Sequence, residues 1–161
     1  LLRETFARFI DGSIEGLTGV PPPSPRRAFV PLLADVAALT WGFSRGNQRL
    51  LQSAYALALT DDFYAARLVV LRTRVFAVLK DQFLHRAGDI GHPRPSVAID
   101  FALRQALAMM SARLEAGRLE VGDGAMDDAT FLRELLRSTL SYLQVPCSDP
   151  EIDRALTARG L

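Results

Sequence analysis

The sequence predicts an all-α protein, and three observations support that prediction. Apolar residues recur at steps of three and four along most of the 161 residues, a spacing that places them on one face of a helix. No stretch alternates apolar and polar residues with a period of two, so no sheet is expected. Glycine and proline clusters separate the apolar segments. We therefore expect about six helices, followed by a short terminal helix, in one domain spanning 1–161.

The first expected helix, Leu1–Leu17, has no capping residue before it, so we expect it to continue a helix that begins upstream. A proline-rich break at 19–25 separates it from a second helix, Pro25–Phe43, because proline is tolerated in a first helical turn. Thr60 is expected to cap the fourth helix. The later helices are expected at Arg49–Leu59, Asp61–Ala87, Ser96–Gly117, Asp128–Leu143 and Ser148–Ala158.

Two long helices, Ser96–Gly117 and Asp128–Leu143, are apolar on more than one side and must be covered on more than one side. Twofold association is the commonest way to cover such a surface, so we predict a homodimer in which these helices form a four-helix bundle. The predicted contact surfaces are a line of small residues on the first helix and a line on the second. They comprise Ala98, Ala102, Ala106, Phe131, Leu135, Ser138 and Tyr142.

Composition narrows the classes of function. A formal net charge of +1 gives no electrostatic reason for binding nucleic acid or an anionic membrane. No apolar run approaches the roughly 20 residues that cross a bilayer, and no signal peptide opens the chain, so we expect a cytoplasmic protein. The single cysteine, Cys147, excludes an intramolecular disulfide. Lys80 is the only lysine, and this preference for arginine is typical of a GC-rich bacterial genome.

The sequence lacks the residue patterns of a catalytic or metal site. His85 and His92 have no second ligand at metal-binding spacing, and we interpret them as surface or capping residues. Cys147 has no histidine near it in sequence and is interpreted as an inert thiol. The two Asp-Asp pairs are explained by helix N-termini. We expect neither enzymatic activity nor a cofactor, although a buried His85 facing a cavity would favour a small helical enzyme.

A few polar and aromatic side chains stand among apolar neighbours, which is how small-molecule pockets are built. In the competing interpretation, Arg72 is ion-paired or snorkelling and the aromatic residues are plain core. As pocket residues, Arg72 and Gln105 would orient a polar group of the ligand and the others would supply apolar area. The candidate lining is Leu33, Val36, Thr40, Trp41, Tyr55, Arg72, Phe76, Phe101, Gln105 and Met109.

Four segments carry a family resemblance: Leu1-Leu-Arg-Glu-Thr-Phe-Ala-Arg-Phe9; Asn47-Gln-Arg-Leu-Leu51 with Leu59-Thr-Asp-Asp-Phe63; Pro95-Ser-Val-Ala-Ile-Asp-Phe-Ala-Leu103; and Asp128-Ala-Thr-Phe-Leu-Arg-Glu-Leu135 with Tyr142-Leu143. In this order they resemble the C-terminal ligand-binding and dimerisation domain of TetR/AcrR-family transcriptional regulators. The resemblance covers nearly the whole chain. The last two segments are similar to the dimerisation helices of that family.

The resemblance implies a repressor that releases DNA when a small apolar or amphipathic effector binds. The effector would lie between Leu1–Leu17, Pro25–Phe43, Asp61–Ala87 and Ser96–Gly117, and would move the first of these helices. Operator DNA would be bound only through an N-terminal helix-turn-helix domain that this sequence does not contain. The implied partners are a second copy of the chain and the effector. The alternative is a stand-alone homodimeric helical interaction module without a ligand, which a filled core would favour.

Overall fold

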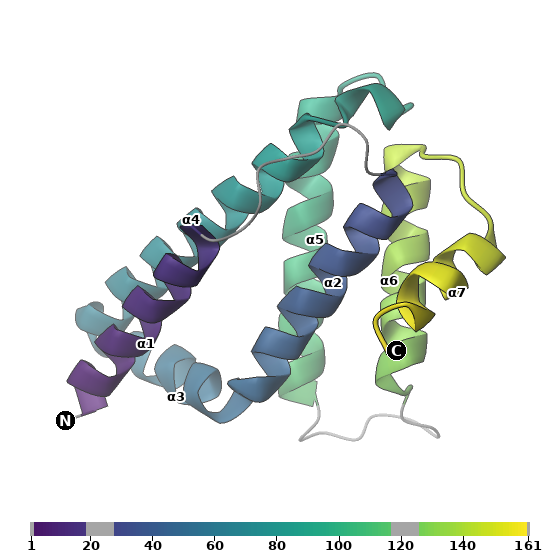
Figure 1. Ribbon diagram of the computed structural model, residues 1–161. Helices are drawn as coiled ribbons and strands as arrows, with labels where there is room; N and C mark the ends of the chain where they lie inside the picture. The colour runs from purple at the N-terminus through teal and green to yellow at the C-terminus, as the bar shows by residue number, and fades with distance from the viewer. Residues whose placement is uncertain (1, 19–27, 117–125, 161) are drawn as a thin grey trace.

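The computed structural model describes residues 2–18, 28–116 and 126–160, and all regular structure in these ranges is helical (Figure 1). The all-α prediction is confirmed for this part of the chain. The described helices are α1 (Leu2–Thr18), α2 (Phe29–Gly46), α3 (Gln48–Ala58), α4 (Asp62–Leu84), the short 3₁₀ helix η1 (Ala87–Asp89), α5 (Pro95–Ala116), α6 (Asp128–Leu143) and α7 (Asp149–Thr157). None of them is long and apolar enough to cross a membrane.

Most helix ends lie within a few residues of the predicted positions, and α4 needs the clearest corrections. Its N-cap is Asp61 rather than Thr60, because the Asp61 carboxylate accepts a hydrogen bond from the amide of Phe63 at 3.0 Å. The helix ends at Leu84, and η1 follows it as a separate turn. The proline-rich break at 19–25 and the Gly/Asp linker between α5 and α6 lie outside the described residues.

The helices pack around two separate apolar clusters, which we call the large core and the small core. The large core lies between α2, α5, α6, α7 and the C-terminal end of α4. The small core lies between α1, α3 and the N-terminal half of α4, and Figure 1 shows α1 lying along α4, away from α6 and α7. The buried residues of the small core are Phe6, Ile10, Ala54, Tyr64, Leu68 and Leu71.

Helix α4 contributes to both cores because one apolar face runs along its length. Leu68 and Leu71 belong to the small core, whereas Phe83, three turns further on, belongs to the large core. Phe76 and Leu79 lie between these positions and pack against the large core. The two cores are therefore joined by one continuous helix.

Other contacts join the two halves of the molecule. The side-chain amides of Gln48 and Gln52, one turn apart on α3, both donate to the carbonyl oxygen of Leu114, at 2.9 and 3.1 Å. Leu114 lies in the last turns of α5, where backbone carbonyls lack partners within the helix. Phe9 of α1 also stacks on Phe43 of α2, with ring centroids 5.7 Å apart. These contacts set the spacing between the small core and the large core.

The loop before α5 is attached to the end of α6. The amide of Gly91 donates to the carbonyl oxygen of Gln144 at 3.3 Å, and Gln144 ends α6 in the left-handed conformation with a φ of 56°. A Cβ atom at position 91 would lie 2.8 Å from that carbonyl oxygen, which is closer than van der Waals contact allows. Glycine is therefore required where the chain passes the end of α6.

Candidate functional site

The candidate site is an apolar cleft inside the large core. Four helices line it, and each presents the face that it turns toward the core. The lining residues are Leu33, Val36, Ala37 and Thr40 of α2; Leu79 and Phe83 of α4; Ile99, Ala102, Leu103, Ala106, Leu107 and Met110 of α5; and Leu135, Leu136, Thr139 and Leu143 of α6. The predicted site also used the second, fourth and fifth helices, but α6 takes the place that was assigned to the first helix.

Carbon atoms form the accessible surface of the cleft, and its free volume is about 30 Å³. Thr40 and Thr139 line the cleft but contribute no polar accessible surface to it, so nothing polar faces this space to hold a water molecule. Leu79, Leu107 and Val36 are half-buried and therefore mark the side on which the cleft meets solvent. A larger guest requires these side chains to move outward.

Two aromatic rings lie one helical turn beyond the lining residues. Trp41 of α2 follows Ala37 by four positions, and Phe131 of α6 precedes Leu135 by four. Their ring centroids are 5.1 Å apart. Trp41 is buried, yet its indole Nε1 has no hydrogen-bond partner among the described residues. The two rings therefore close this end of the cleft, with an unsatisfied donor among them.

The ten predicted ligand-binding residues do not all meet at this cleft. Those that line it are Leu33, Val36 and Thr40, and Trp41 lies at its end. Phe76 is half-buried under the guanidinium of Arg104, 4.8 Å from its ring centroid. The exposed members are Tyr55 on α3, Arg72 on α4, and Phe101, Gln105 and Met109 on α5. A ligand role for these exposed residues stays a prediction, but the described fold does not bring them into the cleft.

Most of the predicted dimer residues face the interior of the protomer rather than its surface. Ala98, Ala102, Phe131 and Leu135 are buried within the protomer, and Ala106 lines the cleft, so these residues have little or no surface to offer a partner. Ser138 is exposed and Tyr142 is half-buried on α6. The small-residue line of α5 thus faces inward together with Ile99 and Leu103, and Phe101 faces outward. Small residues allow α5 to approach its neighbours closely, which is the physical reason for this orientation.

The outward face of α5 presents exposed apolar side chains, with the polar Arg104 and Gln105 between Phe101 and Met109. Val97 is 51% exposed and Phe101 is 52% exposed, and both lie on the side of α5 that also presents Met109. Tyr142 extends this surface onto α6, since its ring centroid is 5.0 Å from that of Phe101. We call these four residues the α5–α6 surface. Exposed apolar surface of this kind marks interaction sites more often than scattered single residues do.

Sequence reasoning missed most of the α5 and α6 lining of the cleft. It assigned Ala102, Ala106 and Leu135 to a partner chain and did not name Ile99, Leu103 or Met110 as pocket residues. The signal was present, because alanines on the inward face of a helix between larger residues leave space beside them. The alanines could be assigned to the cleft only once it was known which face of α5 points into the protomer.

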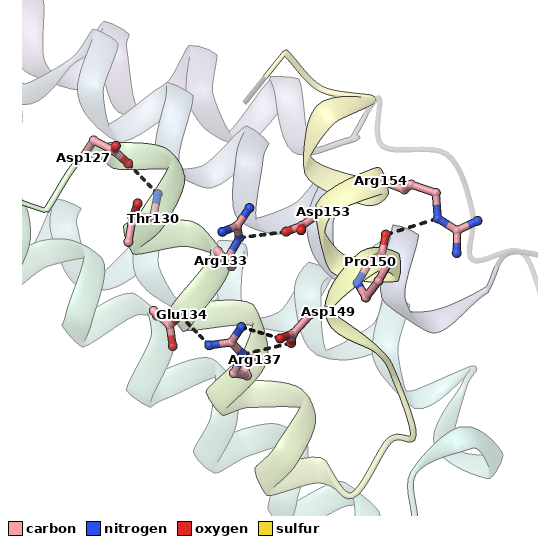
Figure 2. A network of polar contacts seen from close by, with 9 residues as sticks. All are labelled: Asp127, Thr130, Arg133, Glu134, Arg137, Asp149, Pro150, Asp153 and Arg154. Atoms are coloured by element: carbon pink, nitrogen blue, oxygen red, sulfur yellow. Dashed lines mark hydrogen bonds and ion pairs between the residues drawn. The ribbon is translucent and has the colours of Figure 1, made fainter.

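A second hollow, of about 260 Å³, lies between the start of α6 and the end of α7, and charged residues surround it. Arg133 pairs with Asp153 at 2.7 Å, and Arg137 pairs with Asp149 at 3.0 Å, so that α7 is held against α6 (Figure 2). The Arg137 pKa is raised, chiefly by its hydrogen bond to Asp149. These opposite charges are paired with one another, and we assign them to the attachment of α7.

The histidine and cysteine singled out from the sequence lie in surroundings that do not suggest catalysis. His85 is exposed, and its Nδ1 lies 2.9 Å from the carbonyl oxygen of Asp81 in the preceding turn. The Cys147 thiol has a raised pKa because of partial burial and the nearby carboxylates of Glu151 and Asp149, which disfavours the reactive thiolate. Within the described ranges, no cluster of three or more histidine, cysteine or carboxylate side chains could hold a metal ion.

No family model, curated protein or solved structure matches the chain.

Proposed function

We propose that the chain is the ligand-binding and dimerisation domain of a bacterial transcriptional repressor similar to the TetR/AcrR regulators. The observation that supports the ligand-binding part best is the carbon-walled cleft formed by α2, α4, α5 and α6. Apolar pockets enclosed by several helices are typical small-molecule sites in helical proteins. The proposed effector is a small apolar or amphipathic molecule that enters past Leu79 and Leu107 and widens the cleft.

The route from the cleft to α1 runs through α4. Leu79 and Phe83 of α4 line the cleft, and Leu68 of the same helix packs in the small core together with α1. A ligand that prefers a wider cleft shifts the population toward an arrangement in which α4, and with it α1, is displaced. In TetR/AcrR regulators the helix-turn-helix domain precedes the corresponding helix, so this displacement would change the spacing of two DNA-binding domains.

The ligand-binding part is tested with 1-octanol as the probe and the melting temperature as the readout. A ligand that binds the folded state raises the melting temperature with its concentration. We expect 1-octanol to do so for the natural chain, and Ala106→Leu to abolish the rise because the added carbons fill the cleft. Ala77→Leu, at an exposed position of α4 outside the lining, is the matched control and should retain the rise.

The dimerisation part is proposed to use the α5–α6 surface. Phe101→Glu would place a charge in the centre of that surface, and burying an unpaired charge in an interface is costly. Sedimentation equilibrium should give twice the chain mass for the natural chain and the single chain mass for Phe101→Glu. Val69→Glu, at an exposed apolar position on α4, is the control and should remain dimeric. A dimer that survives Phe101→Glu contradicts this assignment.

One observation favours the alternative of a ligand-free dimeric interaction module. The free volume of about 30 Å³ describes a core that is nearly filled. The two proposals differ in the octanol titration. If the natural chain shows no stabilisation by the probe and yet sediments as a dimer, the interaction module is the better description.

A further inference from the structure

Two buried hydrogen-bond donors lack partners at one end of the cleft. Trp41 is 3% exposed, and its Nε1 has no partner among the described residues. The same is true of the Nε atom of Arg113 on α5. Buried polar groups in folded proteins are nearly always hydrogen-bonded, and each exception calls for an explanation.

Both donors border the same aromatic ring. The centroid of the Trp41 ring lies 5.1 Å from that of Phe131, and the guanidinium carbon of Arg113 lies 5.2 Å from the Phe131 centroid. Arg113 follows the lining residue Met110 by three positions on α5, and Trp41 follows the lining residue Ala37 by four positions on α2. The two donors therefore lie together at the end of the cleft that Trp41 and Phe131 close.

Two arginine side chains contact the same carboxylate at this end of the cleft. Arg45 and Arg113 contact one carboxylate, that of Asp128, at 3.4 Å each, which is longer than a strong charge-assisted hydrogen bond. The neighbouring Asp127 is engaged elsewhere, since its carboxylate accepts from the amide of Thr130 at 2.6 Å. Arg113 also donates through Nη2 to the backbone carbonyl oxygen of Met126 and interacts electrostatically with Asp127, so the atom of this guanidinium that is buried without a partner among the described residues is Nε.

An indole N–H and a guanidinium can donate hydrogen bonds but cannot accept them. The group that satisfies both must therefore be an acceptor, and a carboxylate is the acceptor that also gains from the charge of Arg113. The remainder of the cleft offers only carbon atoms. Unpaired donors at one end and apolar walls along the rest of the cleft together fit an amphipathic ligand with an acidic head.

We infer that the ligand of the cleft is a monocarboxylate with a hydrocarbon chain. The chain lies between α2, α4, α5 and α6, and the carboxylate accepts hydrogen bonds from Trp41 Nε1 and Arg113 Nε after the Trp41 and Phe131 rings move apart. This inference rests on the proposed ligand-binding function. It assigns the recognition of the polar head to Trp41 and Arg113, where the sequence had suggested Arg72 and Gln105.

Isothermal titration calorimetry with three eight-carbon probes tests the inference. The probes are octanoate, 1-octanol and octylammonium, which share a chain and differ in the head. We expect octanoate to bind about tenfold more tightly than 1-octanol, because its charged acceptor meets two unpaired donors, and octylammonium to bind most weakly.

Two variants test whether Arg113 and Trp41 cause the preference for octanoate. Arg113→Met keeps the apolar stem and should reduce the affinity for octanoate about tenfold without changing that for 1-octanol. Trp41→Phe keeps a ring and removes the N–H, with the same expected pattern. Arg104→Met, on the same helix but over the ring of Phe76, is the control and should change neither affinity.

Each outcome bears on a separate statement. If all three probes bind equally, the cleft is a ligand site but the carboxylate inference is wrong. If Arg113→Met and Trp41→Phe both fold with the natural melting temperature and retain the preference for octanoate, the assignment to these donors is wrong. If none of the probes binds, the proposed ligand-binding function fails, and the inference fails with it.

Discussion

In the large core, α5 and α6 bury faces turned toward each other and toward α2 and α7, whereas in the small core α1 packs mainly against α4. Leu132 and Ile10 are both fully buried, but Leu132 belongs to the core built from α2, α4, α5, α6 and α7, whereas Ile10 belongs to the core built from α1, α3 and α4. Regions with fewer packed neighbours open more easily than the molecule as a whole. The comparison teaches that α1 is the helix the fold can release most readily, and the proposed repressor requires this helix to move.

The largest expected effects come from a matched pair of leucines. Leu132→Ala in the large core should lower the free energy of unfolding by about 4 kcal/mol, within the range for fully buried leucines. Leu68→Ala in the small core should cost about 2–3 kcal/mol because its surroundings can relax. Amide hydrogen exchange should show loss of protection throughout the chain for Leu132→Ala, and mainly in α1 and α3 for Leu68→Ala. Equal loss in all helices for both variants would show that the two cores unfold as one.

Removing the two glutamine amides tests how much the hydrogen bonds between the cores contribute to stability. Gln48→Leu or Gln52→Leu alone should cost about 0.5 kcal/mol, because the other glutamine still satisfies the Leu114 carbonyl oxygen. The double variant should cost about 2 kcal/mol, since it leaves that acceptor unpaired. Urea denaturation of both single variants and the double variant measures the difference. Simple additivity would mean that water replaces the amides without loss.

Stabilising a helix in either core should raise the free energy of unfolding, by less than the leucine substitutions lower it. Gly12 in α1 and Gly42 in α2 are exposed, and a Cβ at either position meets nothing within 4 Å. Replacing either glycine by alanine should stabilise its helix by up to about 1 kcal/mol. Hydrogen exchange should slow only in α1 for Gly12→Ala, whereas Gly42→Ala should raise the stability of the whole large core. A general slowing caused by Gly12→Ala would contradict the independence of α1.

The smallest expected effect is acid sensitivity at the contact between α1 and α4. The hydrogen bond from Arg3, at 2.6 Å, and the amide of Phe63 lower the pKa of Asp61 below its ordinary value of 3.8. A carboxyl group whose pKa is lowered by folding contributes stability above the unfolded value and loses that contribution as the pH falls through the folded value. Exchange in α1 should therefore accelerate below about pH 3.8.

Asp61→Asn is the control for this measurement. Asparagine keeps the capping interaction with the start of α4 but carries no charge to titrate. The acid-induced acceleration in α1 should be reduced in this variant. If the natural chain and the variant respond identically, the pH dependence originates at another carboxyl group.

Much of the local structure could be predicted from the sequence. The bounds of α6 coincide with the predicted Asp128–Leu143, and those of α5 differ by one residue at each end. These bounds depend on capping residues, helix breakers and the three- and four-residue spacing, which act over a few neighbours. The break between the predicted helices around 88–95 was located for the same reason.

The orientation of α5 was decided only by the tertiary structure. The spacing places Ala102 and Phe101 on different faces of that helix, but when several faces are apolar the pattern does not say which one the protomer buries. Close packing against α2, α4 and α6 selects the alanine face, which leaves Phe101 exposed and opens the cleft beside Ala106. The sequence thus determined which helices form, and the fit between their surfaces determined where the candidate site lies.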